Sequence, residues 1–304
     1  MPVEALDRLA AMLDAEAAEV SAEVDDFFDC LLPLPDDTRA RLYEAMRHAA
    51  IGGGKRLRPL LTVAAAKLFP IGRERAIRVG SAIEALHVYS LIHDDLPCMD
   101  DADTRRGKHS VHKAFGEAEA VLAGDSLHAL AFEILAHEAT HEDPWVRSDL
   151  VLELAQAAGP AGMAGGQMMD LIAEGEQLDL PSITRLQQLK TGALIEYAVE
   201  AACILVRLAH DARTPYRGYA RNVGLAFQIT DDLIDHSGDA AAAGKPTGRD
   251  ADAGKATFVS LLGEERARQQ AALLVDQAIE HLADHGEEAD LLRAIARFAI
   301  ERDH

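Results

Sequence analysis

Two clusters of carboxylates could do chemistry in this sequence, because each falls on or beside a predicted helix. The first lies in HDDLPCMDDADTRRG, residues 93–107. The apolar spacing before it predicts a helix over residues 72–96, and Pro97 disfavours its continuation, so Asp94 and Asp95 fall at the helix C-terminus. A helix C-terminus carries partial negative charge and prefers cations. A solvated acidic loop would tolerate these two carboxylates, whereas a bound cation would stabilise them.

The second cluster lies in FQITDDLID, residues 227–235, inside a helical pattern that begins at Thr214. Asp231 and Asp235 are four residues apart, so both carboxylates share one helix face, and Gln228 lies on the same side. Like charges at this spacing destabilise an isolated helix. Two such clusters favour a shared cation, and their all-oxygen ligands indicate Mg²⁺ or Ca²⁺ rather than zinc.

A calcium-binding EF-hand loop does not fit the first cluster. In the register DADTRRGKHSVH, Arg106 stands where glycine is needed and His112 where glutamate is needed. Magnesium held by a few carboxylates usually keeps positions for water and substrate phosphate, so phosphate-binding cations are expected as well. The candidates that lie beside glycines or acidic clusters are Lys55, Arg56, Arg58, Arg105, Arg106, Lys190, Lys245 and Lys255.

The segment GGGKRLRP at residues 52–59 is not a P-loop. Ala49 stands where the first glycine of that motif is needed, and Arg56 stands where Ser or Thr would coordinate Mg²⁺. A nucleotide hydrolase is therefore poorly supported.

The elements that must position these groups are predicted to be helices throughout. Segments rich in Ala, Leu, Glu and Arg recur with helical apolar spacing, whereas alternating β-branched runs are nearly absent. Breaks containing Pro and Gly separate these segments, and none has the character of an interdomain linker. The predicted fold class is all-α, with one domain over residues 1–304.

The composition excludes several classes of partner. The chain has 51 acidic and 30 basic side chains and a net charge of −21, which disfavours nonspecific binding to nucleic acid or to an anionic membrane. Its three cysteines lie far apart without CxxC spacing, as expected for reduced thiols. No secretory signal and no bilayer-spanning segment is evident. We expect a cytoplasmic protein with no nucleic-acid partner and no membrane insertion.

Six motifs in order along the chain carry a resemblance to a known family. They are GGGKRLRP, HDDLPCMDDADTRRG, GQMMDL, KTG, FQITDDLID and GKPTGRDADAGKAT. Together they resemble the short-chain trans-polyprenyl diphosphate synthase family, most of all the bacterial farnesyl diphosphate synthases. The resemblance implies the all-α isoprenoid synthase fold, a helical bundle around a deep central cavity, and a homodimer. It also implies head-to-tail condensation of isopentenyl diphosphate with dimethylallyl or geranyl diphosphate to give (2E,6E)-farnesyl diphosphate.

The resemblance implies three Mg²⁺ ions, with Mn²⁺ as a substitute, between the two acidic clusters. Asp94 and Asp100 would hold two ions with support from Asp95, and Asp231 would hold the third with Asp232 and Asp235 nearby. The residues expected at the allylic diphosphate are Arg105, Lys190, Lys245, Lys255, Gln228 and Thr191. Gln167 and Asp170 of GQMMDL are expected to orient these side chains without binding the diphosphate themselves. Asp101 and Asp103 compete with Asp100 as the third carboxylate of the first site.

By the same resemblance, the isopentenyl diphosphate is held without metal. The residues implied are Gly54, Lys55, Arg58, His87 and Arg106. His87 lies seven residues before Asp94, which places it on nearly the same helix face; a hydrogen-bonded core histidine is its alternative role. Arg302 near the C-terminus is a further candidate contact.

Product length is expected to depend on bulk in the helical turns before Asp94. Tyr89 and Ser90 lie five and four residues before it, and an aromatic residue at the Tyr89 position resembles the farnesyl synthases. A geranylgeranyl or geranyl diphosphate synthase is the alternative. A terpene cyclase of the same fold has no need for an isopentenyl site, and a noncatalytic subunit would have lost one acidic cluster, so both are less well supported.

Overall fold

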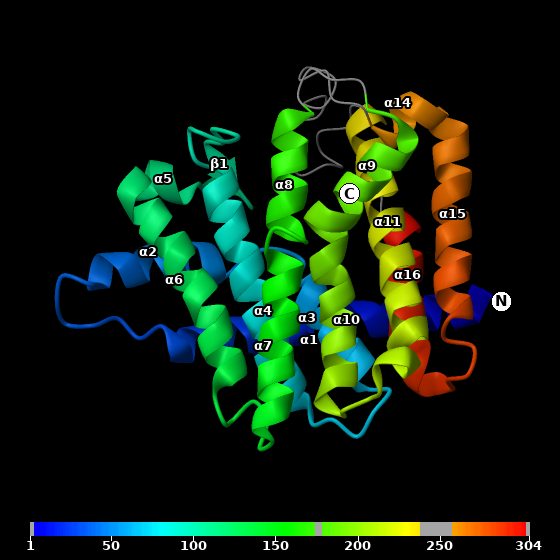
Figure 1. Ribbon diagram of the computed structural model, residues 1–304, viewed down its shortest axis with the longest axis horizontal. Helices are drawn as coiled ribbons and strands as arrows, with labels where there is room; N and C mark the ends of the chain where they lie inside the picture. The colour runs from blue at the N-terminus through cyan, green and yellow to red at the C-terminus, as the bar shows by residue number, and fades with distance from the viewer. Residues whose placement is uncertain (1–2, 174–177, 238–256, 302–304) are drawn as a thin grey trace.

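The computed structural model describes residues 3–173, 178–237 and 257–301, and it confirms the all-α prediction. The helices form one bundle of more than one layer, arranged around α4 (Figure 1). The first half of the chain contains α1 (Val3–Leu31), α2 (Ala40–Ala50), α3 (Leu57–Ala66), α4 (Arg73–Asp94), β1 (Thr104–Arg105), β2 (Lys108–His109), α5 (Val111–Ala114), α6 (Glu117–Ala136) and α7 (Pro144–Ala158). The second half contains α8 (Met163–Ile172), α9 (Leu180–Gln187), the π-helix η1 (Gln188–Gly192), α10 (Ala193–Leu205), the 3₁₀ turn η2 (His210–Arg213), α11 (Thr214–Ser237), α14 (Phe258–Leu262), α15 (Glu264–Glu280), the 3₁₀ turn η3 (Glu287–Ala289) and α16 (Asp290–Glu301).

The core is built around α4 and α10, which are apolar on nearly all sides. Every residue of α10 from Leu194 to Leu205 is buried except Glu196, and α4 packs against α3, α6 and α10. A helix that is apolar all round must be covered by others. Gly80 allows the closest approach, because a Cβ there would lie 2.9 Å from the Cα of Pro59 on α3. The helix that carries the first acidic cluster, α4, is therefore fixed from within the core.

The helix boundaries follow local chemistry. The helix predicted over residues 72–96 is observed as α4, Arg73–Asp94, and the chain turns before Pro97. The helix predicted to begin at Thr214 is α11. Asp143 caps α7 by accepting a hydrogen bond from the backbone N–H of Trp145, with Pro144 in the first turn. No helix in the described ranges has the length and apolarity needed to cross a bilayer.

A short antiparallel hairpin follows the first acidic cluster and departs from the purely helical prediction. β1 pairs with β2 through a two-residue turn made of Arg106 and Gly107, which have φ of 52° and 75°. Two successive positive φ values are the mark of a type I′ turn, which matches the twist of the paired strands. This turn directs the consecutive side chains of Arg105 and Arg106 to different partners.

Candidate active site

The first acidic cluster forms where α4 ends. Asp95 is buried and accepts a hydrogen bond from Nε of Arg105 at 3.0 Å. Asp94 is half-buried, and its pKa is raised to about 6 by burial and by the charges of Asp100 and Asp95, although Lys190 and Arg105 lower it. A carboxylate that is costly to ionise is stabilised by a cation placed beside it. A cation bound at this end of α4 would therefore stabilise the ionised form of Asp94.

The structure distinguishes the three candidates for the third carboxylate. Asp101 and Asp103 both pair with Lys113, at 3.5 Å and 2.9 Å. Asp100 is exposed, its backbone N–H donates to the carbonyl of Asp94 at 2.8 Å, and its charge acts on Asp94. Asp100 is thus the carboxylate that lies beside Asp94.

A cavity of about 520 Å³ opens beside Asp94. It is lined by α3, α4, α6, α8 and η1, and it brings together groups from four of the motifs seen in the sequence or their flanks. Its polar lining residues are Arg58, His87, Tyr89, Ser90, His93, Asp94, Cys98, Gln167, Lys190 and Thr191. The remaining wall is apolar, with Leu96, Met99, Val121 and Met163 among its members. The arrangement suits a substrate with one charged end and one apolar end.

Lys190 and Thr191 belong to the π-helix η1, an irregular turn between α9 and α10. Nζ of Lys190 donates to the carboxylate of Asp170 on α8 at 2.7 Å. The two elements approach closely because Gly166 has no side chain: a Cβ there would lie 2.2 Å from the backbone N of Lys190. Single π-turns inside helices are frequent at functional sites. Here the turn places a lysine whose charge acts on Asp94.

The second acidic cluster lies near the C-terminal end of α11. Asp231 and Asp235 are half-buried, whereas Asp232 is buried. One oxygen of Asp232 accepts from Nε2 of Gln228 at 3.1 Å, and the other accepts from the backbone N–H of Phe258 at 2.9 Å. Asp232 therefore joins the start of α14 to α11, and its expected place among the metal-side carboxylates stays a prediction. Gln228 contacts this carboxylate, and its expected contact with the allylic diphosphate likewise stays a prediction.

The residues expected to bind isopentenyl diphosphate fall on two sides of the loop between α2 and α3. Arg58 and His87 line the cavity beside Asp94, whereas Gly54 and Lys55 line a second cavity between α1, α3, α11 and α16, also about 520 Å³. Nζ of Lys55 lies 5.8 Å from the ring centroid of Phe298. The five expected residues thus lie in or beside the loop between α2 and α3, but they do not line the same cavity.

Burial lowers the pKa values of two residues beside this loop, Arg58 and His87. Burial lowers the pKa of Arg58 to about 10, even though Glu84 opposes the shift, and its Nε has no hydrogen-bond partner among the described residues. Burial and the nearby arginines hold the pKa of His87 well below its usual value, so His87 is neutral. A buried guanidinium that lacks a partner is a candidate for binding an anion.

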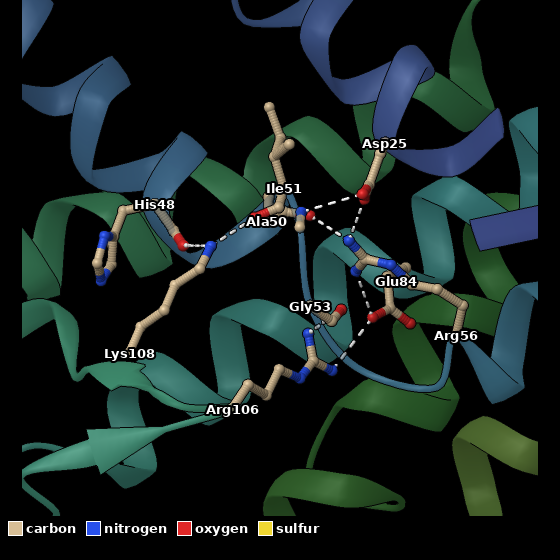
Figure 2. Close-up of polar contacts among 10 residues, drawn as sticks. Asp25, His48, Ala50, Ile51, Gly53, Arg56, Glu84, Arg106 and Lys108 are labelled. Atoms are coloured by element: carbon tan, nitrogen blue, oxygen red, sulfur yellow. Dashed lines mark hydrogen bonds and ion pairs between the residues drawn. The ribbon is translucent and has the colours of Figure 1, made fainter. Parts of the chain in front are cut away.

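Arg106 contacts the same loop and a residue that the sequence did not single out. Its Nη1 donates to the carbonyl of Gly53 at 3.2 Å, and its Nη2 donates to Glu84 at 3.3 Å (Figure 2). Gly54 was expected to allow close backbone approach, and it does so toward this arginine: a Cβ at Gly54 would lie 2.4 Å from Cζ of Arg106. Glu84 could have been found from its place on an apolar helix, three residues before His87.

Tyr89, which lines the cavity, belongs to a row of aromatic rings in contact. Tyr89 makes edge contacts with His93 and His128, at centroid distances of 5.3 Å and 5.0 Å, and His128 contacts Phe132 at 5.1 Å. His128 and Phe132 lie on α6, and no motif or spacing pointed to them. Ser90 donates to the carbonyl of His87 at 2.8 Å. His93 donates from Nε2 to the carbonyl of Val121.

Some expected residues cannot be placed. Lys245, Lys255 and Arg302 lie outside the described residues.

The donor set fits a hard divalent cation. Carboxylate oxygens dominate both clusters, as Mg²⁺ prefers. Within residues 3–173, 178–237 and 257–301, no three acidic, histidine or cysteine side chains converge closely enough to hold an ion alone. Carboxylates on separate helices then need ligand oxygens to complete the coordination.

An all-α bundle with two aspartate clusters, and with a cavity of mixed polar and apolar lining beside the first of them, is the arrangement expected of an enzyme that handles an amphipathic diphosphate. The family model for polyprenyl synthetase matches residues 39–297. The chain belongs to this family.

Individual relatives agree with this assignment. The farnesyl diphosphate synthase of Escherichia coli (strain K12) is 42% identical over 281 residues, which cover 90% of this chain and 93% of that protein. Geranylgeranyl pyrophosphate synthase 11, chloroplastic, of Arabidopsis thaliana is 42% identical over 79% of this chain and 69% of its own. The crystal structure of an FPP/GFPP synthase from Zymomonas mobilis superposes with a TM-score of 0.88 at 57% identity, covering 96% of this chain and 99% of that one.

Proposed function

We propose that the protein is a prenyltransferase that condenses isopentenyl diphosphate with dimethylallyl and then geranyl diphosphate to give (2E,6E)-farnesyl diphosphate. One observation carries the proposal: a cavity of about 520 Å³ is lined by Asp94 and Lys190 together with Tyr89 and apolar side chains. We expect the diphosphate to lie beside Asp94 and Lys190, with its hydrocarbon tail extending toward Tyr89. Farnesyl diphosphate synthases are also prominent among the relatives.

The chain's residues divide the work between two diphosphates. Lys190 and Arg105 supply positive charge beside Asp94, where the allylic diphosphate departs as its C1–O bond breaks. Mg²⁺ held by Asp94, Asp100, Asp231 and Asp235 would neutralise the charge of that leaving group. Arg58 and Arg106 would bind the second diphosphate without metal. A new carbon–carbon bond then forms, and the proton lost from the isopentenyl unit is taken by the released diphosphate.

The apolar wall protects the cation. Leu96, Met99, Val121 and Met163 line the cavity and exclude water that would trap an allylic carbocation as an alcohol. Thr191 lies beside Lys190 on η1 and lines the same cavity. Gln167 lines the cavity one turn before Asp170, which holds Lys190.

We further expect a cytoplasmic homodimer. Exposed apolar side chains on α6 and α7, namely Leu122, Trp145 and Leu152, offer a surface for a second copy.

The test is product analysis. The purified protein is incubated with Mg²⁺, labelled isopentenyl diphosphate and, separately, dimethylallyl, geranyl or farnesyl diphosphate, and the dephosphorylated products are sized. A fifteen-carbon alcohol from the first two, with farnesyl diphosphate left unextended, is the expected result. A twenty-carbon product would keep the reaction and overturn the assigned chain length. No incorporation would overturn the proposed reaction.

A further inference from the structure

A buried carboxylate in the middle of α4 joins two segments of the candidate isopentenyl diphosphate site (Figure 2). Glu84 is 1% exposed and accepts hydrogen bonds from Nη1 of Arg56 at 2.8 Å and from Nη2 of Arg106 at 3.3 Å. Arg56 comes from the loop between α2 and α3, and Arg106 comes from the hairpin turn. A carboxylate this deeply buried persists as a charge only if it is paired.

Arg56 fixes the shape of the loop from inside. Its Nη2 donates to Asp25 at 2.5 Å and to the carbonyl of Ala50 at 2.6 Å, and Asp25 also accepts from the backbone N–H of Gly52 at 3.1 Å. Arg56 has a left-handed φ of 46°, which is costly for a residue with a side chain and is retained because these contacts require it. The loop that carries Gly54 and Lys55 is therefore anchored to Glu84 and Asp25.

Arg106 fastens the hairpin to the outside of the same loop. It donates to the carbonyl of Gly53, and its guanidinium occupies the space that a Cβ at Gly54 would need. Lys108 makes a second attachment, donating to the carbonyl of Ile51 at 2.8 Å and to that of His48 at 3.3 Å. Figure 2 shows Glu84 between the two guanidinium groups, with no other carboxylate drawn beside Arg106.

We propose that Glu84 is a positioning residue for isopentenyl diphosphate, which sets the orientation of Arg106 against the 52–54 loop without touching the substrate. The inference rests on the proposed function. Two carboxylates, Glu84 and Asp25, lie among Arg56, Arg58 and Arg106, so the surroundings keep the net positive charge that a diphosphate needs. The acidic clusters and Lys190 belong to the other diphosphate. Loss of Glu84 therefore affects one substrate selectively.

The main test is Glu84→Gln, which keeps the shape of the side chain and removes its charge. The KM for isopentenyl diphosphate is expected to rise about tenfold or more, from loss of a charge-assisted contact that orients Arg106. The KM for geranyl diphosphate is expected to stay within about twofold, because its binding groups are untouched. An equal rise in both values, or no rise in the first, would overturn the proposal.

Glu200 provides a matched control. It is also buried in a helix, α10, and accepts from Arg213 at 3.3 Å and from Arg217 at 2.6 Å, but it lines neither cavity of the site. Glu200→Gln is expected to lower the melting temperature while leaving both KM values unchanged. If it raises the KM for isopentenyl diphosphate as Glu84→Gln does, the effect is general destabilisation and the proposal fails.

Two further measurements separate the possible failures. In a double-mutant cycle with Arg106→Lys, the KM effects of the two changes are expected to be strongly non-additive, because Glu84 acts through Arg106; additive effects would contradict the proposal. If Glu84→Gln does not fold, Glu84→Asp is measured instead. It keeps the charge but shortens the side chain by one methylene, and an unchanged KM for isopentenyl diphosphate would again contradict the proposal. Calorimetric titration of isopentenyl diphosphate without Mg²⁺ tests the positioning role even if the wild-type protein forms no product, which would refute only the proposed reaction.

Discussion

At the scale of single residues, nearby residues of the same type make different contacts. Asp94 faces the cavity, Asp95 holds Arg105, and Asp101 pairs with Lys113. Arg105 and Arg106 likewise diverge at the hairpin turn, one toward Asp95 and the other toward Glu84. Residue type alone therefore does not assign a role in this site; the partner of each charge does.

Asp94→Ala is expected to lower kcat by about 100-fold or more. It removes a carboxylate proposed to hold the Mg²⁺ that stabilises the departing diphosphate in the transition state. The melting temperature is expected to hold, since a half-buried carboxylate with a raised pKa contributes little to folding. Steady-state kinetics and thermal melting measure the two effects. Asp101→Ala, at an exposed residue paired with Lys113, is the control and should leave turnover nearly unchanged. Near-normal turnover of Asp94→Ala in Mg²⁺ would contradict the metal assignment.

Tyr89→Ala is expected to lengthen the product beyond fifteen carbons. Removing the ring opens the apolar end of the cavity toward His128, and His128→Ala added to it should allow longer products still. Chromatography of the dephosphorylated products gives the distribution. Tyr89→Phe keeps the ring and should retain the wild-type product. If Tyr89→Ala leaves the distribution unchanged, another residue closes the cavity.

At the scale of elements, the irregular pieces position the chemistry. The π-turn η1 packs against α8, α10 and α11 and carries Lys190 and Thr191. The type I′ hairpin does the same for the arginines after α4. Regular helices supply rigid supports, and these two short departures from helical geometry point the cations where the carboxylates are.

Gly166→Ala is expected to separate α8 from η1, because the new Cβ would lie 2.2 Å from the backbone N of Lys190. We expect a higher KM for the allylic diphosphate and a loss of about 1–3 kcal/mol in the free energy of unfolding, as for other overpacked sites. Kinetics with geranyl diphosphate and denaturant unfolding measure these changes. Gly72→Ala, where a Cβ meets nothing within 4 Å, is the matched control. Equal behaviour of the two variants would show that the close approach is unimportant.

Helical periodicity predicted the elements well but not their exceptions. Apolar spacing and proline placement located α4 and α11 and put the carboxylates on them. The hairpin was missed because Arg-Gly is a weak turn signal compared with Asn-Gly. The π-turn has no distinct periodic signature in five residues. The hydrogen bond that Asp232 accepts from the backbone N–H of Phe258 joins segments 26 residues apart, which spacing alone cannot show.

At the scale of the whole molecule, the two acidic clusters come from opposite parts of the bundle. Both α4 and α11 end toward the side of the bundle where the hairpin and α14 lie (Figure 1). In the part of the chain that the structure describes, neither helix has the three converging ligands that would hold an ion by itself. In the proposed Mg²⁺–diphosphate assembly the ligand would contribute oxygens to both sides, so its binding should couple the two halves of the fold.

This coupling predicts a specific pattern of thermal stability. Mg²⁺ alone is expected to shift the melting temperature little, whereas Mg²⁺ with inorganic pyrophosphate should raise it clearly, because a ligand held at about 100 times its Kd stabilises the folded state by about 2.7 kcal/mol. Asp231→Asn should abolish most of the increase, since α11 would no longer join the metal–diphosphate assembly, and EDTA should reverse it. A full shift with Mg²⁺ alone would mean instead that the carboxylates form a complete metal site without the diphosphate.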